Sequence, residues 1–403
     1  MKYKLKTFIS SSGERFSQLY KADEPGFPLF YPTAFIARSI RSHSTHETQK
    51  VYLAAIKRVC EWESSRGIDL AMRFHERKFL SNAEIDDLTS HIRARKSGEK
   101  GEVISSLKYN TYVTYAAMYL SWLAMDVITD SNTPAITDVV TAQHNALLGK
   151  RKRKSSSKSA RERRILAAKL PALTNNQLLD LFEKPFGDLQ QSQGLGQRLR
   201  NVVMLRILYE TGMRIGELLS LKLKSFIAAV GGDSAYLKIE RNHHDAVDTR
   251  LNQPVAKTAG RIVPISESLE KQIEEYLGHF RAEVPNAGFA DEDFIFIVHR
   301  GGRSQGLALP KTSFDSGLAN LKKSFPALIP VHPHLLRHDW NYRFSKKADL
   351  EGMSPEEERT TRDALMGWLR DSHMSRIYDR RHIQEKAYEI GLKIASDTAR
   401  ITN

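Results

Sequence analysis

The sequence predicts a mainly α-helical protein with a helical domain at residues 41–149 and a second, mostly helical domain with a small antiparallel β-sheet at residues 173–403. Three observations predict this architecture. Apolar residues recur at helical spacing behind capping residues along most of the chain. Only three short runs, all in the second half, have the composition of strands. Residues 150–172 begin with a dense run of like charges and serines, which is typical of a linker.

Size and charge narrow the classes of function. At 403 residues and 45.8 kDa, the chain is long enough for two hydrophobic cores. The net charge of +14 and the pI of about 9.6 predict an anionic partner, first of all nucleic acid, with a generic basic protein as the alternative. The lone Cys60 excludes an internal disulfide framework and a cysteine-based zinc site. No apolar run is long enough to span a bilayer or to act as a signal peptide, so we expect a cytoplasmic, nucleoid-associated protein without membrane contact.

The first domain is predicted from its helix starts. Residues 1–40 are expected to form an irregular N-terminal arm, because prolines interrupt their aromatic positions. A first helix is predicted behind the capping-box pattern at residues 44–47, and a second behind the pattern at residues 81–84. A third is expected at about residues 106–125. Three or four helices of this size make a small all-α domain.

The second domain is predicted to begin near Leu173, where Thr174 is expected to cap a helix. The next helix, at about residues 197–210, is predicted to end at Gly212, since glycine is favoured just beyond a helix C-terminus. Strands are expected at residues 235–241, 255–265 and 294–298. Further helices are predicted at about residues 266–281, 311–324, 333–347, 354–370, 373–379 and 383–397.

Six residues of the second domain carry the functional prediction: Arg214, Lys257, His334, Arg337, Trp368 and Tyr378. Two arginines, a lysine, a histidine and a tyrosine are what cleavage of a phosphodiester by a side-chain nucleophile requires. Only about one phenol in a thousand is ionised at pH 7, so making the nucleophile costs roughly 4 kcal/mol without help. Arginine donates two parallel hydrogen bonds to a phosphate, and donors aimed at a developing oxyanion are each worth about 100- to 1000-fold in rate.

The other residues have complementary chemistry. His334 and Arg337 are three residues apart, so on one helix they project toward a shared phosphate. A histidine can take the tyrosine proton or hydrogen-bond the phosphate, and Lys257 at a hairpin tip can protonate the leaving 5′-hydroxyl. Trp368 offers one N–H donor. The linker residues are expected to lie along a DNA backbone, with a solvated tether as the alternative: Arg151, Lys152, Arg153 and Lys154.

Two other kinds of site are disfavoured locally. His332, His334 and His338 could suggest a metal site, but Arg337 beside them would repel a cation. The glycine-rich residues 301–306 lack the Lys-Ser/Thr of a P-loop. Taken singly, Arg214 could be an ordinary surface charge and Tyr378 a packed aromatic. Their joint occurrence in order outweighs these simpler interpretations, so we predict an enzyme that uses no metal or nucleotide cofactor.

In order and spacing, these six residues and their local sequences resemble the tyrosine recombinase (phage integrase) family of site-specific recombinases. The resemblance covers about residues 41–390 and is specific only in the second domain. It implies an integrase-like fold in which two domains clamp duplex DNA. The implied activity is DNA integration or recombination through a 3′-phosphotyrosine intermediate, with Tyr378 as the nucleophile. The arginines would bind the phosphate, Lys257 would be the general acid, and Trp368 stands where the family usually has histidine.

The resemblance also implies double-stranded DNA as the partner, a homotetramer at synapsis, a last helix that docks on a neighbouring protomer, and a bacterial or mobile-element origin. Tyr378 follows Trp368 by one residue more than usual, which leaves Tyr388 as a second candidate nucleophile. The DNA target, the accessory proteins and the state of the free protein stay open. So do two alternatives, a non-catalytic DNA-binding or architectural protein of the same fold and a type IB topoisomerase-like enzyme.

Overall fold

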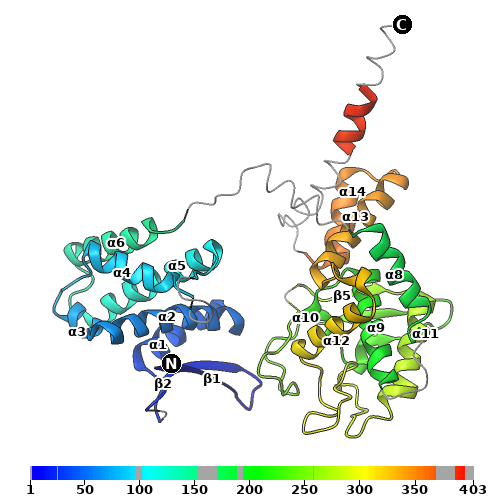
Figure 1. Ribbon diagram of the computed structural model, residues 1–403, viewed down its shortest axis with the longest axis horizontal. Coiled ribbons are helices and arrows are strands. Elements are labelled where there is room, and N and C mark those ends of the chain that lie inside the picture. Colours follow the sequence, from blue (N-terminus) through cyan, green and yellow to red (C-terminus); the bar gives the residue numbers. More distant parts are fainter. Residues whose placement is uncertain are drawn as a thin grey trace. The chain divides into compact units, whose positions relative to one another are not determined.

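The structure, a computed structural model, describes residues 2–24, 26–95, 102–152, 170–187, 194–256, 258–368 and 386–394. The chain divides into two compact units, residues 1–155 and 156–403 (Figure 1). Helices make up most of both units, and the strands form two small antiparallel sheets, so the predicted fold class is confirmed. No helix within the described ranges is long and apolar enough to cross a bilayer.

The N-terminal segment differs from the expected irregular arm. Strands β1 (Tyr3–Ile9) and β2 (Arg15–Lys21) form an antiparallel hairpin, and α1 (Phe30–Phe35) follows it. A π-helical turn (Ile36–Ile40) and a 3-10 turn (Arg41–His43) lead into the next helix. Leu19 and Phe35 are buried in the core of the first unit. The prolines do not prevent this, because Pro28 lies beyond the strands and Pro32 lies in the first turn of α1, where proline is tolerated.

Five more helices complete the first unit: α2 (His46–Arg66), α3 (Leu70–His75), α4 (Asn82–Arg93), α5 (Ser106–Val127) and α6 (Pro134–Gly149). The capping box at Ser81 and Glu84 is confirmed, since each side chain bonds the other residue's backbone N–H. The expected box at residues 44–47 is wrong. Thr45 is the N-cap of α2, and its hydroxyl pairs with the Thr48 hydroxyl rather than with a backbone N–H.

The second unit is built around α9 (Leu195–Thr211), which is buried on almost all sides. Figure 1 shows α8 (Ala172–Glu183), α11 (Glu267–Glu275), α12 (Lys311–Ser324) and α13 (Pro333–Leu350) around it. The unit also contains α10 (Ile215–Leu218) and α14 (Pro355–Met366). Its sheet has the order β3–β4–β5, formed by Phe226–Ile227, Tyr236–Ile239 and Arg261–Pro264.

Several predicted boundaries in this unit are corrected. Thr174 lies inside α8, where its hydroxyl donates to the Ala327 carbonyl, and Pro171 is the N-cap. Residues 294–298 form only isolated bridges, and residues 255, 256 and 258–260 precede β5 without strand structure. The helix predicted at 266–281 becomes π-helical at Tyr276–Arg281. The helix predicted at 373–379 lies outside the described residues.

Candidate active site

Three of the six predicted residues meet at one surface hollow of the second unit. The hollow has a volume of about 340 Å³ and is lined by Arg214, His334 and Arg337, together with Met213, Ile215, Lys311, His332 and Pro333. Arg214 lies at the start of α10, and the other two lie in the first turns of α13. More than 100 residues of sequence separate these two segments, so the core around α9 is what brings the side chains together. Lys311, at the start of α12 and paired with Asp315 (2.6 Å), is a further basic residue of the lining that the sequence had not singled out.

Arg337 is held by the backbone that precedes Arg214. Its side chain is buried, and Nη1 donates a hydrogen bond of 2.6 Å to the Gly212 carbonyl. Gly212 ends α9 as predicted, with a positive φ of 62°. A Cβ at this position would lie 2.8 Å from the Trp340 ring, so both its conformation and its surroundings require glycine. The turn at Gly212 therefore orients Arg337 through its carbonyl, and it lies two residues before Arg214.

Glu217 connects the start of α10 to the segment that leads into β5. Its carboxylate is fully buried and accepts hydrogen bonds from the Arg214 backbone N–H (2.9 Å), the Thr258 hydroxyl (2.7 Å) and Arg261 Nη2 (2.8 Å). Burial alone would raise the pKa of Glu217, but the hydrogen bonds and charge of Arg261, with the other donors, hold it at about 2. Sequence reasoning missed Glu217 and Arg261. The available sign was an acidic residue three positions after Arg214, which is typical of a first helical turn.

Lys257 itself lies outside the described residues, but its neighbours are placed. Ala256 is fully buried, and Thr258 is bonded to Glu217. A Cβ on Gly216 would lie 2.7 Å from the Val255 carbonyl oxygen, so the segment before Lys257 packs closely on α10. Residues on both sides of Lys257, Val255 and Thr258, thus contact α10, whose N-cap is Arg214.

Trp368 packs against Arg337 at the end of α14. The Arg337 guanidinium carbon lies 5.3 Å from the centre of the indole ring, within the range of a cation–π contact. The chain before Trp368 is fixed to the segment that leads into β5. Arg261 Nε donates to the Leu365 carbonyl (2.7 Å), and the Ala259 N–H donates to the Gly367 carbonyl (3.3 Å). Trp368 is therefore placed against a predicted phosphate-binding arginine.

His334 is exposed at the hollow, with protein packed on its other side. That partial burial lowers its pKa, and the nearby charges of His332, Arg337 and Arg214 lower it further. The ring is therefore neutral at neutral pH and has a nitrogen that can accept a proton. His332 has a different task, because its Nδ1 accepts the Leu335 N–H (3.1 Å) and so caps α13.

Three other predicted residues, Tyr378, Arg153 and Lys154, lie outside the described ranges. Arg151 and Lys152 are described and exposed at the end of the first unit. There the Lys152 backbone exchanges two hydrogen bonds of 2.8 Å with the Asn110 side chain, so the first residues of the linker are fixed to α5.

Residues 173–382, more than half of the chain, match the phage integrase family. The chain belongs to this family. The matched range includes all six predicted residues, among them Lys257 and Tyr378.

Curated relatives carry tyrosine recombinase names. The chain is 30% identical to the tyrosine recombinase XerC of Roseiflexus sp. (strain RS-1) over 187 residues, which cover 45% of this chain and 49% of that protein. It is 29% identical to the tyrosine recombinase XerD of Listeria monocytogenes serotype 4b (strain F2365) over 190 residues, covering 46% and 52%. The chain thus spans about half the length of these relatives.

Similar solved structures include the XerH site-specific recombinase bound to difH substrate, with 19% identity and a TM-score of 0.45 over 77% of this chain and 70% of that one. The Tn1549 transposon integrase in complex with circular intermediate DNA has 16% identity and a TM-score of 0.43, over 86% and 93%. With TM-scores below 0.5, both likenesses are loose.

Proposed function

We propose that this protein is a site-specific DNA recombinase that cleaves and rejoins DNA through a 3′-phosphotyrosine intermediate. The observation that carries the proposal is the meeting of Arg214, His334 and Arg337 at one open hollow in a member of the phage integrase family. The tyrosine recombinase names of the relatives support it. Two guanidinium groups around one space suit a phosphodiester better than a neutral substrate, because they match its charge and its paired oxygens.

In the proposed reaction, Arg214 and Arg337 bind the non-bridging oxygens of the phosphate to be cleaved. Arg337 is pre-oriented, because one of its nitrogens is already bonded to the Gly212 carbonyl and its guanidinium carbon lies 5.3 Å from the centre of the Trp368 ring. Donors that need no rearrangement are the ones that stabilise a developing charge most effectively. Glu217 positions Arg214 by accepting its backbone N–H.

The nucleophile we propose is the Tyr378 oxygen, which bonds to phosphorus while the bond to the 5′-oxygen breaks. His334, neutral at neutral pH, accepts the phenol proton or hydrogen-bonds the phosphate. Lys257 gives a proton to the departing 5′-oxygen. Rejoining is the reverse: a 5′-hydroxyl attacks the phosphotyrosine and the phenol regains its proton. Trp368 has no proton to exchange near neutral pH, so His334 and Lys257 carry the acid–base steps.

Double-stranded DNA is the proposed partner, with four protomers assembling on two sites. We place the linker residues Arg151, Lys152, Arg153 and Lys154 along its backbone. Charge supports this placement, since each phosphate neutralised by a lysine or arginine releases counterions. Removing two of these charges (Arg151→Ala with Lys152→Ala) should reduce the slope of log affinity against log salt by about 2.

The test is covalent trapping. Footprinting on the DNA that flanks the protein's own gene identifies a binding site. A duplex of that site with a nick next to the cleavage position loses its short 5′-hydroxyl fragment, so a covalent adduct accumulates. Tyr378→Phe should abolish the adduct, and Tyr388→Phe, which alters an exposed tyrosine of the helix at residues 386–394, should keep it.

An adduct that persists in Tyr378→Phe refutes the nucleophile assignment. Site-specific binding by the wild-type protein without any adduct would identify a non-catalytic DNA-binding protein instead. Relaxation of supercoiled plasmids that lack the site would identify a topoisomerase.

A further inference from the structure

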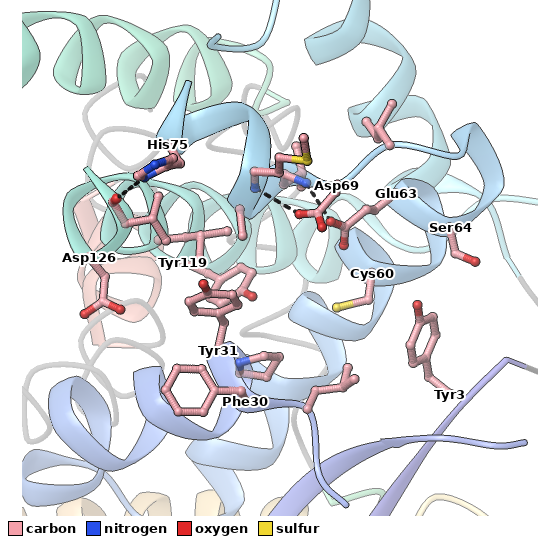
Figure 2. A pocket seen from close by; sticks show the side chains of 18 of the residues that line it. Tyr3, Phe30, Tyr31, Cys60, Glu63, Ser64, Asp69, His75, Tyr119 and Asp126 are labelled. Carbon is pink, nitrogen blue, oxygen red and sulfur yellow. Dashed lines mark hydrogen bonds between the residues drawn. The ribbon is translucent and has the colours of Figure 1, made fainter. Parts of the chain in front are cut away.

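A large hollow in the first unit lies outside the proposed chemistry. Its volume is about 830 Å³, within the range of ligand pockets. Its walls come from the β1–β2 hairpin and from α1, α2, α3 and α5 (Figure 2). Carboxylates and aromatic rings share the lining. The acidic residues are Glu63, Asp69 and Asp126, and the rings belong to Tyr3, Phe30, Tyr31 and Tyr119.

Two of the carboxylates lack a cationic partner in the part of the chain that the structure describes. Glu63 accepts the Leu70 backbone N–H (2.8 Å) and Asp69 the Met72 backbone N–H (3.0 Å), but among the described residues neither has a cationic partner. Burial is the main cause that raises the pKa of Glu63. The nearby Asp69 carboxylate raises that pKa further. Figure 2 shows the two carboxylates next to one another.

The basic groups of the lining are already engaged. The Lys21 ammonium is paired with Glu24 (3.3 Å), and His75 Nδ1 is bonded to the Val127 carbonyl (3.1 Å). The third carboxylate, Asp126, is paired with Arg38 (3.3 Å). The uncompensated negative charge of the hollow is therefore at Glu63 and Asp69.

The largely buried Tyr119 side chain also lines this space. Tyr119 is only 4% exposed and lines the hollow, yet its hydroxyl has no hydrogen-bond partner among the described residues. The hydroxyl is therefore available to a ligand that enters the hollow. The tyrosine hydroxyl, the free oxygen of Glu63 and the Asp69 carboxylate are all able to accept hydrogen bonds.

We propose that this hollow is a binding site for a guanidinium or ammonium group carried on an apolar stem. Such a group supplies several N–H donors and the missing positive charge, and aromatic faces such as those of Phe30 and Tyr31 attract it. The apolar side chains of Leu29 and Leu123 offer contacts to the stem. An anion would be repelled by the carboxylates. A metal ion is not the occupant we propose, because no three His, Cys, Asp or Glu side chains of the described residues gather here as a ligand set.

The same chemistry has two sources, a basic side chain of a partner protein and a free organic cation. Isothermal titration of the full-length protein with two matched pairs of probes separates them. One pair is n-butylguanidinium and its neutral counterpart n-butylurea. The other is the peptide acetyl-Gly-Leu-Arg-Leu-Gly-amide and the same peptide with citrulline in place of arginine. Binding of either cation against a net charge of +14 cannot come from general electrostatic attraction.

We expect a cationic probe to bind and its neutral counterpart to bind at least about tenfold more weakly. A peptide that binds about tenfold more tightly than n-butylguanidinium indicates a partner protein, and equal affinities indicate a free cation. Glu63→Gln should weaken binding by about 10- to 100-fold and Tyr119→Phe by about 2- to 10-fold. Tyr119→Phe removes only an unbonded hydroxyl, so it leaves folding intact even if Glu63→Gln does not.

Asp138→Asn is the matched control, because it removes one negative charge from the exposed face of α6 outside the hollow and should leave the affinity unchanged. The proposal is overturned if neither cation binds, if the neutral counterparts bind equally well, or if Tyr119→Phe and Glu63→Gln both retain the wild-type affinity.

Discussion

Replacing Glu217 by glutamine removes one buried charge at the point where three segments of the second unit meet. Glutamine keeps the shape of the side chain, but it leaves the Arg261 guanidinium, 5% exposed, without its anionic partner. The carboxylate has a pKa of about 2 in the folded protein, against an ordinary value of 4.5. Because each tenfold change in an acid constant corresponds to about 1.4 kcal/mol, that difference is worth about 3 kcal/mol at neutral pH. The cost of breaking a buried ion pair is about the same.

This stability has a defined pH dependence. The pKa of Glu217 is lowered by folding, so its contribution is complete above the unfolded value near 4.5 and is lost as the pH falls toward 2. We therefore expect Glu217→Gln to lower the melting temperature of the second unit by about 6–12 °C at pH 7. The difference from the wild type should shrink progressively below pH 5.

Tryptophan fluorescence suits this measurement, because Trp62 and Trp122 report on the first unit and Trp340 and Trp368 on the second. Glu274→Gln, on the exposed face of α11, is the control and should change the melting temperature by about 2 °C or less. Adduct formation at a temperature where Glu217→Gln stays folded should also fall, since the carboxylate positions Arg214. A mutant that melts within about 2 °C of the wild type at pH 7 would refute the account of Glu217 as the centre of this network.

Three further predictions concern other parts of the structure. Gly212→Ala should destabilise the second unit by about 1–3 kcal/mol in urea unfolding, because φ is positive there and the new Cβ would lie 2.8 Å from the Trp340 ring; unchanged stability would contradict this geometry. The rate of adduct formation should be constant from pH 7 to 8 and fall below pH 6.5 as His334 becomes protonated, because its pKa is lowered; His334→Gln should lose that acid limb, and a limb that persists would assign it to another group. Leu19→Ala should destabilise the first unit by about 2–5 kcal/mol in the same unfolding assay, because the side chain is fully buried; a change below about 0.5 kcal/mol would show that the hairpin is a detachable arm.

Helix boundaries were predictable where local chemistry decides them. The predicted box at Ser81 starts α4, and the helix predicted from residue 354 begins there behind a box of Ser354 and Glu357. Both starts are local, because a capping residue and its partner are only three positions apart. Gly212 ends α9 for a similarly local reason. The box predicted at residues 44–47 failed because Thr45, not Ser44, is the N-cap of α2. The hairpin at residues 3–21 was missed, since its burial depends on α2 and on the rest of the core rather than on its own pattern.

The sequence by itself determined the chemical groups of the site and the pairing of His334 with Arg337, because helical spacing of three residues fixes which side chains share a face. That Arg214 joins them was implied only by the family resemblance, and the tertiary structure brings it there through the packing of α9 against α13. It also decided that Glu217 ties Arg214 to Thr258 and Arg261, which lie 41 and 44 residues further along the chain. A buried carboxylate is stable only when distant donors converge on it, and no local pattern in the sequence records that convergence.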